Sequence, residues 1–461
     1  MIGSLLFIAL VAQAPSGMTP AAPGALEQRP APGDASPLQL RIDAASAGSV
    51  VVVEAGTYTG DLVIDRPLQL VGRGRPTLVG SGHGTVVRIR AADVTVEGFD
   101  IDGREGGDIS RDSAGIHIAA RRAIIRDCRI TRALFGIYLR EADGTVVDHC
   151  RITGMANLAP GEQGSGIHVW NTDGFRLTDN TIQYSRDGIY IQSSPHGVTL
   201  RNTASDLRYG LHYMFSDDNV FEDNLFERGA AGAALMYSRR LIFRRNRFLH
   251  NRGFASVGLL LQVCDDVEAE DNLIADNARG VFMEGVHRNI FRRNVIADSD
   301  TALVLYDSVR ESRFEGNAFF GNLSPLEFVG RRTDTIVDGN YWSDSAGADL
   351  DGDGVEDGPY RLSSVFDHFR GNLTAADLFA QGLGAKILSR AEETFPVLDP
   401  IPVVDAHPLA RAPKLPNVPL PPPRDATRGA GWAIVASACG LTAGVAVLIA
   451  GRRPGHGGGG S

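Results

Sequence analysis

One histidine and two methionines recur at a spacing that could create a site for a soft metal ion. His212 and Met214 are two positions apart, and Met236 follows Met214 by 22 residues. Thioether sulfur together with imidazole selects Cu(I) over hard ions such as Mg²⁺ and Ca²⁺. The three side chains can share an ion only if the fold places residues that are 22 positions apart side by side.

A second group of chemical interest is acidic. Asp349, Asp351, Asp353 and Asp357 stand at positions 1, 3, 5 and 9 of a segment that also has a glycine at position 6. This spacing matches the first part of an EF-hand-type loop, which binds Ca²⁺ through carboxylate oxygens. Position 12 is Tyr360 instead of the bidentate glutamate. The pattern therefore predicts either a structural calcium site or a plain acidic turn.

A short repeat organises the chain from about residue 115 to residue 342. Each copy opens with glycine, an apolar residue, a variable residue and a second apolar residue: Gly115-Ile-His-Ile, Gly136-Ile-Tyr-Leu, Gly166-Ile-His-Val, Gly188-Ile-Tyr-Ile, Gly210-Leu-His-Tyr, Gly258-Leu-Leu-Leu, Gly280-Val-Phe-Met and, more weakly, Gly232-Ala-Ala-Leu. Each later copy also carries an asparagine: Asn180, Asn202, Asn224, Asn246, Asn272, Asn294, Asn317 and Asn340. Successive asparagines differ by 22, 22, 22, 26, 22, 23 and 23 residues.

This period predicts a stacked β-solenoid. The segments alternate with period two, which excludes helical repeats, and the consensus of leucine-rich repeats is missing. We therefore expect an all-β fold, a right-handed single-stranded parallel β-helix of the pectin-lyase-like kind, with coils about 4.8 Å apart. The repeated asparagine should form a ladder of amides at one corner, where asparagine tolerates left-handed backbone.

Alternation also predicts which side chains share the outer face. If the first and third residues after each glycine point inward, the second and fourth point outward. His212 and Met214 then lie side by side on one strand, and Met236 lies one coil further on. His168 and Glu284 fall on the same outer face, and Met155 lies in an extension at about residues 154–164. These six residues are the candidates for a Cu(I) site; the alternative is that another segment covers the face and the methionines only pack against it.

The remaining segments divide the chain further. We expect a signal peptide and Ala/Pro-rich leader at 1–37, the β-helix at 38–371, and a capping or docking segment at 372–412 with a helix at about 374–393. A Pro-rich linker follows at 413–428, then a transmembrane helix at 429–453 and a flexible or artificial tail at 454–461. This order predicts an exported, periplasmic protein that is anchored to the inner membrane, with Arg452 and Arg453 on the cytoplasmic side.

The net charge bears on the kind of partner, and the positions of two cysteines bear on disulfide formation. The net charge of -10 argues against nucleic acid as a partner. Cys128 and Cys150 occupy the position where later copies carry the ladder asparagine, so they should be neighbours on adjacent coils. A buried thiol pair is the simpler interpretation, and a disulfide is the alternative in an exported chain.

Many β-helices cleave acidic polysaccharides, which makes a glycan-binding or glycan-cleaving protein an alternative. Asn171-Thr-Asp173, Asp217-Asp218 and Gly82-His83-Gly84 are similar to motifs of β-helical pectin hydrolases. The histidine motif here precedes the acidic ones, whereas it follows them in those enzymes. Coils so far apart do not give the carboxyl spacing of roughly 5–9.5 Å that glycoside hydrolysis requires, so we do not expect an enzyme.

The segment Arg208-Tyr-Gly-Leu-His-Tyr-Met-Phe-Ser-Asp-Asp-Asn219 resembles the NosD family, the periplasmic β-helical accessory proteins of nitrous-oxide reductase maturation. Further matching stretches are Val53-Glu-Ala-Gly-Thr-Tyr58, Arg186-Asp-Gly-Ile-Tyr190, Ala233-Ala-Leu-Met-Tyr-Ser238, Gly339-Asn-Tyr-Trp-Ser-Asp344 and Gly358-Pro-Tyr-Arg361. The resemblance covers roughly residues 40–410.

The resemblance implies a non-enzymatic protein that handles copper with an ABC-type permease and ATPase, a copper-chaperone lipoprotein and nitrous-oxide reductase. Its distinctive stretches include His212, Met214 and Met236, the residues already selected for Cu(I). A scaffold that binds no metal and only bridges the transporter and its client stays open as an alternative.

Overall fold

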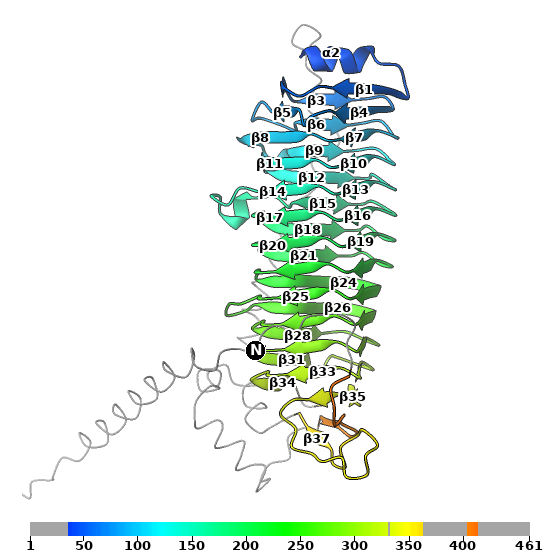
Figure 1. Ribbon diagram of the computed structural model, residues 1–461, viewed down its shortest axis with the longest axis vertical. Helices are drawn as coiled ribbons and strands as arrows, with labels where there is room; N and C mark the ends of the chain where they lie inside the picture. Colours follow the sequence, from blue (N-terminus) through cyan, green and yellow to red (C-terminus); the bar gives the residue numbers. More distant parts are fainter. Residues whose placement is uncertain (1–35, 331, 363–402, 414–461) are drawn as a thin grey trace, which may run out of the picture. The chain divides into compact units, whose positions relative to one another are not determined.

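The computed structural model describes residues 36–330, 332–362 and 403–413. Short parallel strands stack coil upon coil in this part of the chain, as Figure 1 shows from α2 (Pro37–Ala44) and β1 (Ser49–Val53) in blue to β35 (Ile336–Asp338) in yellow. The strands form three faces around an apolar lumen. The prediction of an all-β parallel solenoid is confirmed.

The first face consists of the strands that contain the repeated glycine. They are β3 (Leu62–Ile64), β6 (Val87–Ile89), β9 (Ala114–Ile118), β12 (Phe135–Arg140), β15 (Ile167–Trp170), β18 (Asp187–Gln192), β21 (Tyr209–Met214), the first parts of β24 (Ala231–Arg244) and β26 (Val257–Glu270), β28 (Arg279–Glu284), β31 (Thr301–Tyr306) and β34 (Ser324–Val329). Each strand pairs in parallel with the strand of the next coil, so equivalent residues of successive copies lie side by side.

The second face follows the first around each coil. It contains β1, β4 (Leu68–Gly72), β7 (Thr95–Glu97), β10 (Ile124–Arg126), β13 (Val146–Asp148), β16 (Arg176–Thr178), β19 (Val198–Leu200), β22 (Val220–Glu222), the later parts of β24 and β26, β29 (Ile290–Arg292), β32 (Arg313–Glu315) and β35.

The third face is a separate 13-stranded parallel sheet, which gives the solenoid about 13 turns. Its strands are β2 (Thr57–Thr59), β5 (Thr77–Val79), β8 (Asp100–Gly106), β11 (Arg129–Ala133), β14 (Arg151–Thr153), β17 (Thr181–Gln183), β20 (Thr203–Ser205), β23 (Leu225–Glu227), β25 (Arg247–Leu249), β27 (Leu273–Ala275), β30 (Val295–Ala297), β33 (Ala318–Phe320) and β36 (Tyr341–Trp342).

The lumen is filled by the inward residues that alternation selects. Leu211 and Tyr213 of β21 are completely buried there, as are the aromatic residues of the second face. Phe221 and Phe243, for example, stack across neighbouring coils with ring centroids 4.5 Å apart. This continuous apolar core fixes the register, because a slip of one residue would turn every inward side chain outward.

The asparagine ladder forms as expected, but its backbone differs from the prediction. Each buried amide bonds to the rungs on both sides. The Oδ1 atom of Asn224, for example, accepts from the backbone N–H of Asn202, and its Nδ2 atom donates to Oδ1 of Asn246 at 2.9 Å. The left-handed residue is the one before the asparagine, for example Asp223 with φ 55° and Arg245 with φ 53°. The expectation that asparagine itself adopts the left-handed conformation is therefore wrong. The ladder is specified by hydrogen bonding instead.

Two free, buried cysteines, Cys128 and Cys150, occupy the two rungs that precede Asn180, the first asparagine of the ladder. The backbone N–H of Cys150 donates to the Oδ1 atom of Asn180, which joins the thiol positions to the amide ladder. The interpretation as a buried thiol pair is confirmed.

Both described ends of the stack are covered. At the N-terminal end the prediction that the β-helix begins at residue 38 is wrong, because α2 occupies Pro37–Ala44 and buries Leu38 and Ile42 against the first coils. At the other end β37 (Tyr360–Arg361) pairs antiparallel with β38 (Val404–Asp405). The buried carboxylate of Asp405 accepts from the backbone N–H and the side-chain Nδ2 of Asn340, and so ends the ladder.

Several predicted segments lie outside the described residues. They are the leader, the helix at 374–393, most of the Pro-rich linker, the transmembrane helix at 429–453 and the tail. Among the residues that the structure describes, no helix has the length and apolarity needed to cross a membrane.

Candidate metal centre

His212 lies on the side of β21 that faces away from the lumen. Its neighbours Leu211 and Tyr213 point into the core, so alternation turns His212 and Met214 to the outer side of the first face. The Nδ1 atom of His212 lies 3.1 Å from Oδ2 of Asp187 on the preceding coil. A carboxylate accepts a hydrogen bond, which places the imidazole proton on Nδ1 and leaves the Nε2 lone pair for a metal ion.

Asp187 is held as a carboxylate in this completely buried position. Arg208 donates to its two oxygens at 2.8 and 2.7 Å. Burial alone would raise the pKa of Asp187, but the hydrogen bond with His212 and the charge of Arg208 lower the pKa below its usual value. Burial in turn lowers the pKa of His212, although Asp187 opposes this shift. The geometry favours a neutral imidazole oriented by an anion, the form in which histidine binds metals.

The two methionines occupy adjacent rungs beside this imidazole. Met214 pairs in register with Met236 between β21 and β24, so the two side chains are about 4.8 Å apart along the stack. The hydroxyl of Tyr190 lies 4.0 Å from the Met214 sulfur. In the same register, Gln192 precedes Met214 and Gln262 follows Met236. The two thioethers are therefore the only sulfur atoms in this described column, between two amides.

These side chains lie outside the lumen, as predicted, but they are not exposed to water. His212, Met214 and Met236 are only 3%, 7% and 3% exposed. Both methionines belong to an apolar cluster that is distinct from the lumen and also contains Ala234, Leu260 and Phe282. The alternation of a strand identifies which side chains leave the lumen, but it does not reveal whether they remain in water.

The other copper candidates lie elsewhere. His168 is two coils before His212, and the ring of Tyr190 lies between them, with centroids 4.4 and 4.7 Å from the two imidazoles. Met155 belongs to a different apolar cluster, with Phe135 and Tyr138. Glu284 is two coils beyond Met236 and accepts a hydrogen bond from Gln262. The fold therefore brings together three of the six candidates.

A continuous ladder of rings lies on the outer side of the first face, and the contact between successive rings was not among the predictions. The ladder runs His117, Tyr138, His168, Tyr190 and His212, with successive centroids 5.2, 4.4, 4.4 and 4.7 Å apart. Burial, followed by nearby positive charge, lowers the pKa of His117 and that of His168 to about 3. Their neutral rings stack on tyrosines as part of the packing. The alternation of histidine and tyrosine in the second position after glycine is the signal that could have found this ladder.

The acidic loop brings three of its four predicted calcium ligands together. Carboxylate oxygens of Asp349, Asp351 and Asp353 lie within 4.8 Å of one another. Asp357 instead accepts a hydrogen bond from the backbone N–H of Leu350 at 2.7 Å. Asp349 likewise accepts from two backbone N–H groups of the loop. The calcium site stays a prediction, and Asp357 is not part of the cluster.

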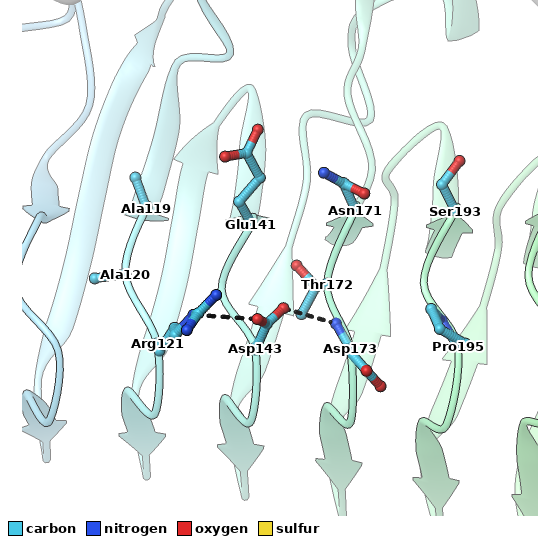
Figure 2. A pocket seen from close by; sticks show the side chains of 10 residues that line it. All are labelled: Ala119, Ala120, Arg121, Glu141, Asp143, Asn171, Thr172, Asp173, Ser193 and Pro195. Atoms are coloured by element: carbon cyan, nitrogen blue, oxygen red, sulfur yellow. Dashed lines mark hydrogen bonds and ion pairs between the residues drawn. The ribbon is translucent and has the colours of Figure 1, made fainter.

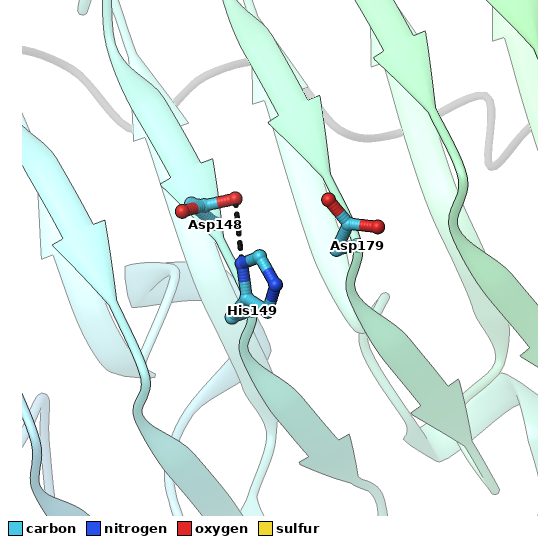
Figure 3. Close-up of side chains that lie close together, drawn as sticks. All are labelled: Asp148, His149 and Asp179. Atoms are coloured by element: carbon cyan, nitrogen blue, oxygen red, sulfur yellow. Dashed lines mark ion pairs between the residues drawn. The ribbon is translucent and has the colours of Figure 1, made fainter.

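Another histidine-containing group is an ion-pair network. Asp148, His149 and Asp179 lie together at the corner between the second and third faces (Figure 3), with His149 Nδ1 2.9 Å from Asp148. Arg201 binds both oxygens of Asp179, and Arg126 pairs with Asp148. These arginines neutralise the carboxylates that a cation would need.

A groove runs along the corner that follows the first face (Figure 2). It is lined by Ala119, Ala120, Arg121, Glu141, Asp143, Asn171, Thr172, Asp173, Ser193 and Pro195. Asp143 pairs with Arg121 at 3.2 Å and accepts from the backbone N–H of Asp173. The hydrolase-like Asp217 and Asp218 lie on later coils and are bound by Arg239 and Arg240.

Comparison with known proteins identifies the relatives of this chain. The family model of the periplasmic copper-binding protein NosD matches residues 149–348. A probable ABC transporter binding protein NosD from Pseudomonas aeruginosa is 32% identical over 395 residues, 82% of this chain and 91% of the relative. The chain belongs to the NosD family. A NosD from Stutzerimonas stutzeri with the same description is 30% identical over 78% of this chain and 86% of its own length.

The NosD match includes the region of His212, Met214 and Met236, and its relatives are named as binding proteins. Solved structures support the fold alone. The A-module of a mannuronan C-5 epimerase from Azotobacter vinelandii covers 65% of this NosD chain and 92% of its own, with a TM-score of 0.53 and 15% identity. A family 28 exopolygalacturonase from Yersinia enterocolitica has a TM-score of 0.52 and 12% identity, and covers 65% and 74% of the two chains.

Proposed function

We propose that this NosD-family chain binds Cu(I) as cargo through His212, Met214 and Met236 and hands it over for the copper cluster of nitrous-oxide reductase. The observation that carries the proposal is the in-register pair of thioethers beside an imidazole whose Nδ1 atom meets a buried carboxylate. Two soft sulfur ligands and a neutral nitrogen ligand suit Cu(I) and not Ca²⁺ or Mg²⁺.

The names of the relatives support the ABC transporter as a partner, and the resemblance to the NosD family implies the lipoprotein and the reductase. The relatives are named as ABC transporter binding proteins, and the family model describes a periplasmic copper-binding protein. We assign to this chain an ABC permease and ATPase, a copper-chaperone lipoprotein and the reductase as partners in the periplasm. The proposed organisation joins a right-handed β-helix to a docking segment at 372–412 and an inner-membrane anchor at 429–453.

A scaffold without metal is the second candidate, and burial favours it. Met214 and Met236 lie among apolar side chains, where a thioether fills space as leucine would. In this alternative, the chain bridges the transporter and its client, and the methionines only pack.

Replacing methionine by leucine in cells separates the two functions. Leucine keeps the apolar volume but removes the sulfur, so Met214→Leu/Met236→Leu should fold normally. We expect cells that carry this variant to accumulate nitrous-oxide reductase with little copper and little activity. The control is Met283→Leu, a methionine completely buried in the lumen. Full maturation with the double variant would favour the scaffold.

A further inference from the structure

The corner between the first and second faces holds one left-handed residue on each of seven successive coils. These residues are Glu141, Asn171, Ser193, Phe215, Tyr237, Val263 and Gly285, with φ between 49° and 64°. Left-handed backbone favours glycine, asparagine and aspartate, whereas bulky and β-branched residues are outliers there. Three neighbouring coils break this preference with phenylalanine, tyrosine and valine.

We call Phe215, Tyr237 and Val263 the corner strip. Their side chains are 52%, 46% and 46% exposed, and the rings of Phe215 and Tyr237 stack with centroids 5.0 Å apart. Because the closure of each coil imposes the left-handed backbone, the feature that sets these three coils apart is the exposed apolar side chain. Neighbouring apolar side chains that remain exposed to water are typical of interaction surfaces.

The corner strip lies on the coils of the candidate metal centre. Phe215 directly follows Met214, and Tyr237 directly follows Met236. The same corner holds polar residues on the earlier coils, where Asn171 and Ser193 line a polar groove (Figure 2). The change from polar to apolar residues therefore coincides with the two thioethers.

The charges beside the corner strip determine which kind of partner fits. Asp217 pairs with Arg239, Asp218 pairs with Arg240, and Arg288 of a later coil binds Asp266. The positive and negative charges cancel within each pair, so this surface has no extended positive potential that would attract a nucleic acid or an acidic glycan. A protein with an apolar contact face matches an exposed aromatic pair with a neutral rim.

We propose that the corner strip is the docking surface of the protein that exchanges Cu(I) with this chain, a carrier with an apolar contact face and thioether or imidazole ligands. The inference rests on the proposed function and assigns the side from which the ion is exchanged. The ligands are almost completely buried, so a free ion has little access to them. A carrier seated on the corner strip lies one residue from both thioethers.

The test uses the full-length protein with Phe215→Asn, Tyr237→Asn and Val263→Asn combined. Asparagine already occupies this corner as Asn171, so the variant relieves strain and should fold at least as well as the wild type. The matched control is Tyr184→Asn. Tyr184 is also exposed and left-handed, with φ 58°, but it lies at the corner that follows the third face.

Two measurements are made on each protein. The first is the affinity for a purified, metal-free periplasmic Cu(I) carrier protein with methionine ligands, and the second is Cu(I) affinity in competition with a small chelator. We expect the triple variant to bind the carrier at least about ten-fold more weakly, with unchanged Cu(I) affinity, and the control to match the wild type.

Equal carrier affinity of the triple variant and the wild type, or no carrier binding by either, would overturn the docking surface. So would a change in the sedimentation or proteolysis of the triple variant, since this would indicate contact with a second copy or with another part of this chain. If the wild type binds the carrier but no Cu(I), the proposed function fails while the corner strip is still tested by carrier affinity.

Discussion

His212 meets Asp187 through its Nδ1 atom, and this contact decides which nitrogen is left for a metal ion. Asp187 is completely buried and is bound through both oxygens by Arg208. The carboxylate thus has two functions, to orient the imidazole and to neutralise the guanidinium. Each function predicts a measurable loss when the charge is removed.

We predict that Asp187→Asn weakens Cu(I) binding by roughly 10- to 100-fold, as expected for a partner that orients a metal ligand. The same substitution should lower the free energy of unfolding by about 3–5 kcal/mol, because Arg208 keeps a charge without its buried partner. Chelator competition and chemical denaturation measure the two effects.

The matched control is Asp179→Asn, which removes a carboxylate bound through both oxygens by Arg201 at a solvent-accessible corner. Such a pair contributes less than about 1 kcal/mol, and Cu(I) affinity should stay at the wild-type value. If Asp187→Asn also leaves Cu(I) affinity unchanged, Asp187 does not orient a ligand.

His117 should make stability depend on pH. Burial, with help from the charges of Arg88 and Arg140, lowers the pKa of His117 from 6.5 to about 3. Between these pH values the unfolded chain binds a proton that the folded chain does not, so stability decreases as the pH falls. Above pH 6.5 the imidazole is neutral in both states and the effect vanishes.

We therefore expect His117→Gln to reduce the pH dependence of the unfolding free energy by about 1.4 kcal/mol per pH unit between pH 6 and pH 4. The difference between the variant and the wild type at pH 8 gives the packing contribution separately. Parallel stability curves for the two proteins across this range would contradict the neutral, buried state of His117.

At the scale of the repeat, the regular positions of glycine and asparagine were enough to predict the coils, their parallel stacking and the register that joins Met214 to Met236. The partner of His212 could not be predicted in this way. Asp187 stands immediately before the repeated Gly188, outside the alternating positions, and only the three-dimensional path of β18 brings it to the imidazole.

The burial of the copper candidates also could not be predicted from the sequence. Period-two alternation arises because the residues that point into the lumen must be apolar. It therefore separates inward from outward residues, but it gives no information on what surrounds the outer side. The left-handed residues before each ladder asparagine were missed for a similar reason. Residues as different as Asp223 and Arg245 adopt this conformation, because the closure of each coil imposes it.

The hydrogen bonds of the amide ladder should contribute to the free energy of unfolding. Asn246 accepts from the backbone N–H of Asn224 and donates to the carbonyl of Phe221. Asn246→Ala leaves both groups buried without these bonds and should lower the free energy of unfolding by about 3 kcal/mol or more.

Cys150→Ala, at the equivalent ladder position, removes weak thiol contacts with two carbonyls at 3.4 and 3.8 Å and with the Cys128 thiol, and should cost about 1 kcal/mol. Chemical denaturation of both variants gives the comparison. Equal losses would show that the amide hydrogen bonds do not stabilise the stack.

At the scale of the molecule, the contacts of the solenoid run mainly between neighbouring coils. The candidate centre therefore depends on the coils of β18, β21 and β24. A bound ion would link the turns of β21 and β24 directly, and Asp187 on β18 would act on it through His212. Binding to the folded state alone stabilises that state, so Cu(I) should protect these coils most strongly. The same locality lets the outer surface change character from coil to coil, as it does where the polar corner becomes the corner strip.

The most direct measurement is a Cu(I) titration of the full-length protein under reducing conditions, in competition with a coloured Cu(I) chelator. The wild type and Met283→Leu should each bind one Cu(I) tightly. Met214→Leu/Met236→Leu should lose more than the roughly 100-fold in affinity that an outer-shell partner contributes, because it removes two ligands. Equal affinity and stoichiometry in all three proteins would contradict the copper centre.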